Sequence, residues 1–466
     1  MANKLRSKDF KNIGIKSNKT ISIAMAITKK YFKNNSKEEK LELIKKIKDN
    51  PEDYLNDNRL SVLASEFFEA EEDYNSPIAL NEKEVELNVF GRPLIKSNAL
   101  LQMKTAMKLP IVEKAALMPD SHLGYGLPIG GVLATHNAVI PFAIGMDIGC
   151  RMSLTLYQAT ERFLKMHEHK FKQSIINNTA FGLAKIIEQS QEHEFLDRDV
   201  FHKTPLLKKL KSKAAKQLGS SGSGNHFVEW GIVEMRADEI VGLPEGTYVG
   251  LLAHSGSRGF GASIAKFYSE LASAKSNLPY NMRHLAWLDL SEENGQEYWL
   301  SMNLAGDYAK ACHDQIHKNV AKVIKLKPIC KIENHHNFAW KENVDGQELI
   351  VHRKGATPAG KNVLGIIPGS MTDPGFIVKG KGNVDSMASA SHGAGRKHSR
   401  KETISKNTKS EMRKQLIQNK VTLIGGALDE SPFAYKSLEK VMAFQEALVE
   451  PIGKFYPRIV RMDRDK

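Results

Sequence analysis

Apolar residues repeat at helical spacing in the first part of the chain. Between residues 41 and 47 they recur every three positions, which places them on one face of a helix. Ser36 and Glu39 have the spacing of a capping box, and Asn50-Pro51 provides a stop signal. The pattern therefore predicts one amphipathic helix between these two signals.

A second pattern of the same kind runs from about residue 59 to 72, with its apolar residues on one side. Almost no glycine occurs before residue 86, and nothing in this stretch suggests chemistry. We therefore expect residues 1–85 to form a helical N-terminal region, followed by a separate domain over 86–466.

From about residue 89 the pattern changes to short, strand-like apolar runs separated by glycine-rich turns. A long helical repeat over 304–325 includes Cys312, which is therefore predicted to be a core residue. Together these patterns predict a mixed α/β fold: one large catalytic domain with central β-sheets, surrounding helices and the helical N-terminal region in front.

Composition narrows the class of protein. The chain has 466 residues, 41% of them hydrophobic, which is enough for a sizeable core, and no apolar run is long enough to span a membrane. Cys150, Cys312 and Cys330 are too few and too far apart for a disulfide framework, so we expect a cytoplasmic protein. The net charge of +14 favours nucleic acid as a partner, although many lysine-rich proteins are merely soluble and basic.

Several segments carry residues suited to metal or phosphate chemistry. Asp147 and Cys150 follow an apolar run read as a buried strand, and both could turn toward one cation, although a turn aspartate beside a plain buried cysteine is the simpler interpretation. The glycine-serine loop 219–226 could admit a phosphate but lacks the P-loop pattern. Three histidines lie in glycine- or asparagine-rich settings, and with the thiol and carboxylate they would suit Mn²⁺ or Zn²⁺: His254, His336 and His392.

Eight motifs then follow one another in a characteristic order. They are MPDSHLGYGLPIGG (118–131), GMDIGC (145–150), GSGNHF (222–227), HSGSRG (254–259), NHHN (334–337), HRKGATPA (352–359), PGSM (368–371) and SHGAGR (391–396). In order and sequence this set resembles the RtcB family of RNA ligases. Chance agreement over eight collinear motifs is very improbable.

The resemblance implies an RNA ligase that uses GTP and two Mn²⁺ ions. Such an enzyme joins an RNA 2′,3′-cyclic phosphate or 3′-phosphate end to a 5′-hydroxyl end through a histidine–GMP intermediate, in tRNA splicing or RNA repair. The implied nucleophile is His392, with Asp120 and His122 at the edge of the site or behind it. The implied metal ligands are Asp147, Cys150, His226, His254 and His336. The implied guanylate contacts are Asn225, Phe227, Glu229, Asn337, Pro368, Gly369, Ser370, Met371, Gly393, Ala394 and Gly395, and the residues near RNA or phosphate are Arg353, Arg396 and Arg400.

Two departures from the family pattern bear on the nucleotide base. Met371 is followed by Thr-Asp-Pro-Gly, where the family commonly has Gly-Thr and then a serine, and the chain ends in RMDRDK rather than in a Lys-Gly tail. Lys466 is the residue of this chain that could take the place of the tail lysine.

Two other functions remain open: a two-metal phosphoesterase or nuclease without guanylylation, and a non-catalytic RNA-binding protein. We expect a monomer whose RNA partner is a tRNA half or a broken RNA end. The RNA track is predicted near Arg396, Arg400 and Lys401, or else along Lys208, Lys209, Lys211, Lys213 and Lys216.

Overall fold

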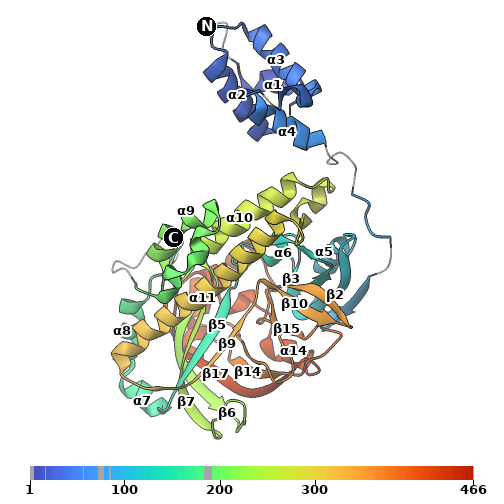
Figure 1. Cartoon of the computed structure of the whole chain (residues 1–466). Coiled ribbons are helices and arrows are strands. Elements are labelled where there is room, and N and C mark those ends of the chain that lie inside the picture. The colour runs from blue at the N-terminus through green and yellow to red at the C-terminus, as the bar shows by residue number, and fades with distance from the viewer. Residues whose placement is uncertain are drawn as a thin grey trace. The chain divides into compact units, whose positions relative to one another are not determined.

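The computed structural model describes residues 5–15, 17–55, 57–71, 78–82, 85–182 and 191–464. The chain divides into two compact units, Met1–Ile78 and Ala79–Lys466, which we call the N-terminal and C-terminal units (Figure 1). The division between the units lies seven residues before the 85/86 boundary predicted from the sequence, and the first strand of the C-terminal unit begins at Glu86.

The N-terminal unit is helical in its described part. Ser36 and Glu39 form the predicted capping box: the Ser36 hydroxyl accepts from Glu39 N at 3.1 Å, and the Glu39 carboxylate accepts from Ser36 N at 2.8 Å. Buried apolar side chains such as Phe10 and Ile44 form its core. Both predicted helices are confirmed. The elements are α1 (Ser7–Asn12), α2 (Asn18–Tyr31), α3 (Lys37–Asp49), η1 (Pro51–Tyr54) and α4 (Ser61–Glu71).

The C-terminal unit contains an eight-stranded sheet with the order β13-β14-β17-β6-β7-β5-β9, and β16 pairs with β17. Its two end strands approach each other, because the Asn334 side chain on β9 exchanges hydrogen bonds of 2.9 and 3.2 Å with the backbone of Ile366 on β13. The sheet is therefore nearly closed. Its strands are β5 (Arg151–Tyr157), β6 (Phe227–Met235), β7 (Gly246–Ser255), β9 (Pro328–His335), β13 (Leu364–Ile367), β14 (Gly375–Gly380), β16 (Thr422–Gly426) and β17 (Val449–Arg464).

A second sheet of five strands has the order β1-β2-β3-β11-β10. The chain passes from the first sheet to the second at residues 336–337, between β9 and β10, and this crossing becomes important for the site. The strands are β1 (Glu86–Val89), β2 (Val112–His122), β3 (Ile129–Thr135), β10 (Phe338–Val344) and β11 (Gln347–Lys354), with the short pairs β12 (Ala356–Pro358) with β15 (Ser389–Ser391) and β4 (Ala138–Val139) with β8 (Leu288–Asp289).

Helices cover the eight-stranded sheet, and the longest, α11 (Glu293–Ile324), crosses it diagonally (Figure 1). This helix confirms the repeat predicted over 304–325 but begins eleven residues earlier, and Cys312 is fully buried in its core-facing side as expected. Helices α8 (Glu168–Asn178) and α10 (Arg258–Ala274) contact α11, and α9 (Pro205–Gln217) contacts α10. The mixed α/β prediction is confirmed.

The remaining helices are short. They are η2 (Arg92–Leu94), α5 (Ser97–Ala106), α6 (Pro141–Ile144), α7 (Glu161–Met166), η3 (Glu194–Asp197), η4 (Asp199–His202), η5 (Tyr280–Leu285), α12 (Arg400–Lys406), α13 (Lys409–Gln418), η6 (Leu428–Glu430), η7 (Pro432–Ala434) and α14 (Leu438–Ala443). Within the described parts of the chain, no helix has the combination of length and hydropathy that a bilayer crossing requires.

Candidate active site

A cavity of about 300 Å³ opens where four neighbouring strands of the larger sheet share an edge. Strands β6 and β5 begin at this edge and the antiparallel strands β7 and β9 end there, so residues distant in sequence meet. The predicted nucleophile, metal ligands and guanylate contacts all line this cavity, as do Arg396, Arg400 and His122, whereas Arg353 and Asp120 do not. The wall thus includes Asp147, Cys150, Asn225, His226, Phe227, Glu229, His254, His336, Asn337, Pro368, Gly369, Ser370, Met371, His392, Gly393, Ala394, Gly395, Arg396 and Arg400.

Strand register explains how the candidate metal ligands come together. His254, near the end of β7, pairs with Phe227 at the start of β6, so His226 lies beside it. Cys150 immediately precedes β5, and its carbonyl accepts a 2.9 Å hydrogen bond from the backbone N–H of His336, which follows β9. One row of adjacent strands therefore delivers three imidazoles and the thiol to a single point.

The segment before Cys150 differs from the sequence-based prediction. The apolar run read as a buried strand is instead the two-residue strand β4 followed by helix α6. Pro141 is the first residue of α6, where its fixed φ favours a helical turn, and Gly145 with φ of 98° ends it. Asp147 and Cys150 nevertheless turn toward the same point, as expected of a pair that shares a cation.

The potential ligand atoms form two groups that share Cys150. One group contains Cys150, His254 and His336: the Cys150 Sγ lies 3.2 Å from His254 Nε2, which lies 3.3 Å from His336 Nε2. The other contains Asp147, Cys150 and His226: the Sγ lies 3.4 Å from His226 Nε2, which lies 3.0 Å from an Asp147 carboxylate oxygen. Cys150 belongs to both groups, so its sulfur could act as a ligand in either of them.

The protonation states of the cluster favour a bound metal ion over side chains that only hydrogen-bond to one another. His254 Nδ1 lies 3.1 Å from the Asn225 carbonyl, which can only accept, so the ring directs the lone pair of Nε2 toward the cluster. Burial, with a smaller effect of His226, lowers the pKa of His254 to about 3. Burial also raises the pKa of the Cys150 thiol well above its ordinary value, so the thiolate needs an adjacent cation. Mixed sulfur, imidazole and carboxylate donors suit borderline divalent metals.

Asp147 supplies the negative charge of the cluster. Burial works to raise the pKa of this carboxyl, but the hydrogen bond and charge of His226 outweigh it and lower the pKa to about 2. The carboxylate also accepts a 3.1 Å hydrogen bond from Ser257 N. A side chain at Gly256 would collide with it, because a Cβ there would lie 2.0 Å from its oxygen, which explains the glycine of this motif.

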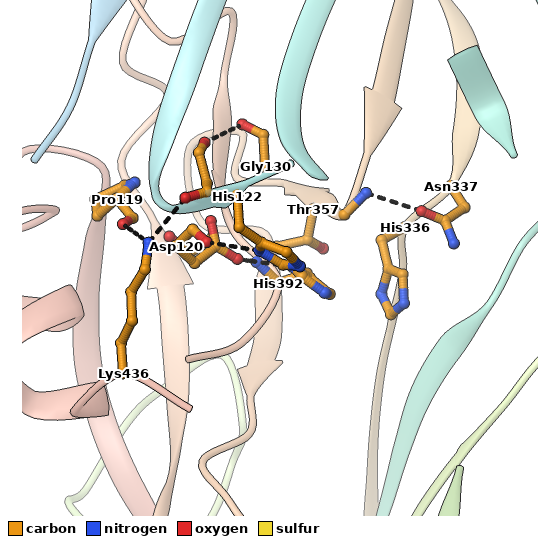
Figure 2. A network of polar contacts seen from close by, with 12 residues as sticks. Pro119, Asp120, His122, Gly130, His336, Asn337, Thr357, His392 and Lys436 are labelled. Carbon is orange, nitrogen blue, oxygen red and sulfur yellow. Dashed lines mark hydrogen bonds and ion pairs between the residues drawn. The ribbon is translucent and has the colours of Figure 1, made fainter. Parts of the chain in front are cut away.

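His392 lines the same cavity and lies near His336 of the cluster (Figure 2). Its ring centroid lies 4.9 Å from that of His336. Its Nδ1 lies 2.7 Å from a carboxylate oxygen of Asp120, which also accepts from the His392 backbone N–H at 3.2 Å. Because a carboxylate only accepts, Nδ1 is the nitrogen that donates to Asp120, and in the neutral ring the lone pair then lies on Nε2. This is the state that a histidine nucleophile requires.

The Asp120 side chain is fully buried, and neighbouring residues fix the backbone around it. Lys436 donates to the carbonyls of Pro119 and Ser121 at 3.1 and 2.9 Å on either side of it (Figure 2). Burial lowers the pKa of Lys436 to about 8, against the opposing charge of Asp120. The backbone of Asp120 also abuts Gly395, where a Cβ would lie 2.1 Å from the Asp120 carbonyl oxygen. Only glycine fits at that position, which additionally has φ of 71°.

Backbone contacts hold the loops around the cluster. The glycine-serine loop 219–226 is supported by the buried Arg258, which donates to Ser220 Oγ at 3.1 Å. Gly222 leaves room for His226, because a Cβ there would lie 1.8 Å from the ring. Asn337 accepts from Gly355 N at 2.8 Å and contacts the Asp147 carbonyl at 3.4 Å. The Asn337 side chain thus joins the crossing at 336–337 to the segments that contain Gly355 and Asp147.

The wall that is predicted to bind the nucleotide contains an unexpected acid. Asp373, in the altered segment after Met371, accepts a 2.8 Å hydrogen bond from the Ser370 hydroxyl and lines the cavity. Glu229 on β6 is buried there, and burial raises its pKa well above the ordinary value. Glu229 is therefore able to present a neutral carboxylic acid, which both donates and accepts.

Two arginines at the cavity wall share one buried carboxylate. Glu430 lies 3.2 Å from Arg396 Nη1 and also pairs with Arg400, and Tyr435 donates to it. Arg400 additionally pairs with Asp429 and reaches Gly224 in the glycine-serine loop. Both guanidiniums are thus oriented before any phosphate arrives.

The structure corrects the prediction for Arg353. This residue is fully buried, outside the cavity, and both its terminal nitrogens donate to the Glu342 carboxylate at 2.8 Å. It also donates to Ser389 Oγ at 2.7 Å and to the Met387 carbonyl at 2.8 Å. A guanidinium occupied in this way joins β10 and β11 to the strand that precedes His392, and it has no face left for RNA.

Sequence reasoning missed several wall residues. Glu430 and Tyr435 lie in a segment that no quoted motif covers, and β17 adds Phe455, Pro457, Val460 and Met462. Only the alternation of apolar residues along β17 could have indicated a strand there, without showing which cavity it lines. Lys466 lies outside the described residues.

Comparison with known proteins agrees with this geometry. Residues 102–463 match the family model described as tRNA-splicing ligase RtcB. The RNA-splicing ligase RtcB of Escherichia coli K12 is 32% identical over 395 residues, covering 77% of this chain and 92% of that protein. The tRNA-splicing ligase RtcB of Nanoarchaeum equitans is 32% identical (74% and 87% covered), and that of Thermococcus kodakarensis is 29% identical with the same coverage. The cavity and its cluster of histidine, cysteine and aspartate side chains are compatible with a metal-dependent enzyme site. The chain belongs to the RtcB family of RNA-splicing ligases.

Proposed function

We propose that this chain joins an RNA 2′,3′-cyclic phosphate or 3′-phosphate end to a 5′-hydroxyl end, with GTP as the energy source. The observation that carries the proposal is the position of His392: its Nδ1 is held by Asp120, and its ring lies beside the His336 ligand of the candidate metal cluster. A simple hydrolase would need the cluster but not a histidine oriented in this way.

The proposed first step is attack by His392 Nε2 on the α-phosphorus of GTP. A P–N bond forms, the bond from phosphorus to the pyrophosphate oxygen breaks, and pyrophosphate leaves. Asp120 keeps the proton on Nδ1 and balances the charge that develops on the ring. Arg396 and Arg400, oriented by Glu430, are placed to bind phosphate oxygens at the wall.

The second and third steps use the RNA ends. A cyclic end is first opened by water to a 3′-phosphate, an oxygen of which attacks the His392-bound phosphorus, so that the P–N bond breaks and GMP passes to the RNA. The 5′-hydroxyl then attacks the activated 3′-phosphate, a phosphodiester forms and GMP leaves. Mn²⁺ bound by Asp147, Cys150, His226, His254 and His336 would neutralise phosphate charge throughout.

The preference for guanine over the other nucleotide bases is a separate part of the proposal. We infer that guanine is read by Glu229 and the 368–371 turn, whose Ser370 is bonded to Asp373. Incubation with each of the four labelled nucleotides tests this inference. Equal labelling by ATP and GTP would contradict it without touching the rest of the proposal.

A ligation assay with defined ends tests the function itself. A labelled RNA with a 3′-phosphate is mixed with a 5′-hydroxyl RNA, GTP and Mn²⁺, and we expect a joined product from the parent and none from His392→Ala. Removal of the 3′-phosphate or cleavage, unaffected by GTP and by His392→Ala, would instead support the two-metal phosphoesterase alternative.

A further inference from the structure

Four large apolar side chains are strongly exposed on three segments that contact one another. They are Leu101 on α5 (66% exposed), Leu123 and Tyr125 in the loop after β2 (55% and 74%), and Tyr280 at the start of η5 (79%). We call them the aromatic patch. Large exposed apolar groups that lie together mark a surface for binding.

The three segments that carry the patch touch one another. Gln102 on α5 donates to the carbonyls of Gly124 and Gly126 at 2.8 and 2.9 Å and accepts from Gly124 N at 3.1 Å. On the other side, a Cβ at Gly126 would lie 3.0 Å from the His284 carbonyl oxygen of η5. The loop that presents Tyr125 is therefore clamped between α5 and η5.

The patch is also continuous with the cavity. Tyr125 lies between His122 and Ile129, and both of these line the cavity wall. The buried Lys354 donates to the Tyr125 carbonyl and, at 2.8 Å, to the Phe142 carbonyl, and its neighbour Gly355 belongs to the wall. Tyr125 thus lies on a loop that is hydrogen-bonded to Lys354, the residue next to Gly355 of the cavity wall.

Charge around the patch favours a polyanion. The segments 87–110, 121–146 and 274–288 contain no aspartate or glutamate, whereas Lys96, Lys104, Lys108 and Arg283 are all exposed there. The Arg283 guanidinium lies over the Tyr280 ring, 4.4 Å from its centre. Exposed rings beside exposed cations suit single-stranded nucleic acid, whose bases stack while its phosphates bind the charges.

We propose that the aromatic patch is a stacking platform for unpaired bases of the RNA strand that enters the cavity, with Tyr125 and Tyr280 as the stacking rings. The inference rests on the proposed RNA-joining function and adds a place where substrate binds outside the reacting centre. Stacking uses the ring face and tolerates any base, so it would serve broken ends of varied sequence.

Substitution of the two rings tests the platform. The probe is a labelled single-stranded RNA of ten nucleotides with a 3′-phosphate, and its dissociation constant is measured by fluorescence anisotropy. Tyr125→Ala and Tyr280→Ala should each weaken binding by about fivefold or more, and the double variant by about 25-fold. Tyr125→Phe with Tyr280→Phe should bind as the parent does, because both rings remain.

The dependence of RNA affinity on salt concentration distinguishes base stacking from contacts with phosphate. The double alanine variant should keep the parent's dependence of affinity on salt, because no phosphate contact is removed, so the two log–log lines run parallel. An unchanged unfolding midpoint excludes misfolding as the cause of weak binding. A double alanine variant that binds with the parent's affinity overturns the platform, even if the parent joins RNA ends normally. If binding is ring-dependent but no ends are joined, the platform stands and the proposed function fails.

Discussion

The bond between Asp120 and His392 is the contact on which the proposed nucleophile most depends. The change that probes it is Asp120→Asn, which keeps the shape of the side chain and removes its charge. Asn can still accept from His392 Nδ1 through its oxygen, but the 2.7 Å charge-assisted bond and its balance of the developing imidazolium are lost.

The expected magnitude follows from burial. A hydrogen bond to a charged group contributes about 1.5 to 3 kcal/mol, and this one is fully buried on the Asp120 side. If that energy is realised in the transition state, the first chemical step slows by about 10- to 150-fold. Nucleotide affinity should change little, since Asp120 does not line the cavity.

The assay is single-turnover labelling of the protein by GTP radiolabelled at the α-phosphate, over a range of concentrations that separates rate from affinity. Ser121→Ala is the matched control: this neighbouring side chain is also buried and donates to Gly130 O at 3.1 Å, but it does not touch His392. Parent-like labelling by Asp120→Asn, or equal slowing by both variants, would refute the assignment of Asp120 as the residue that positions His392.

Three further predictions concern the metal, the nucleotide wall and the corrected arginine. Cys150→Ala should lose bound Mn²⁺, measured by elemental analysis, because both ligand groups share the Cys150 sulfur. Cys312 is also buried but belongs to neither group, so Cys312→Ala should retain the metal. Equal Mn²⁺ content in the two variants would contradict the assignment of Cys150 as a metal ligand. Burial raises the pKa of Glu229, so the folded state binds the carboxyl proton more tightly than the unfolded state does. The stability gained from this proton is therefore complete below the unfolded-state pKa and is lost as the pH rises through the folded-state pKa. Glu229→Gln should therefore be more stable than the parent at pH 8, with the difference vanishing near about pH 4 in denaturant unfolding. Arg353→Ala should lower the free energy of unfolding by about 3 kcal/mol through its broken pair with Glu342; a loss of RNA binding at unchanged stability would restore the original prediction.

Local patterns predicted the fold class and many of the elements. The capping box at Ser36 and the repeat around Cys312 are short-range signals, and both helices formed as expected. The run before Asp147 was misread because Pro141 and Gly145 fit a turn of helix as readily as the end of a strand. The start of α11 was missed because Glu292 provides no side-chain cap.

The site was harder to predict where the role of a residue depends on which other side chains it contacts. Arg353 belongs to a family motif, but its charge in the sequence does not reveal that Glu342 and Ser389 surround it. Asp120 and His392 are 272 positions apart, so their bond follows only from the way β2 and β15 are placed. Glu430 likewise shows its role only once both arginines are seen to share it.

The most direct test of the proposed chemistry is covalent labelling at His392. The protein is incubated with Mn²⁺ and GTP labelled at the α-phosphate, and the polypeptide is then analysed for bound label and for its stability in acid and in alkali. The account predicts an acid-labile, alkali-stable GMP adduct on the peptide that contains His392, absent from His392→Ala, because a phosphoramidate forms at its Nε2. Label that persists in His392→Ala, or its complete absence from a metal-loaded parent, would contradict the account.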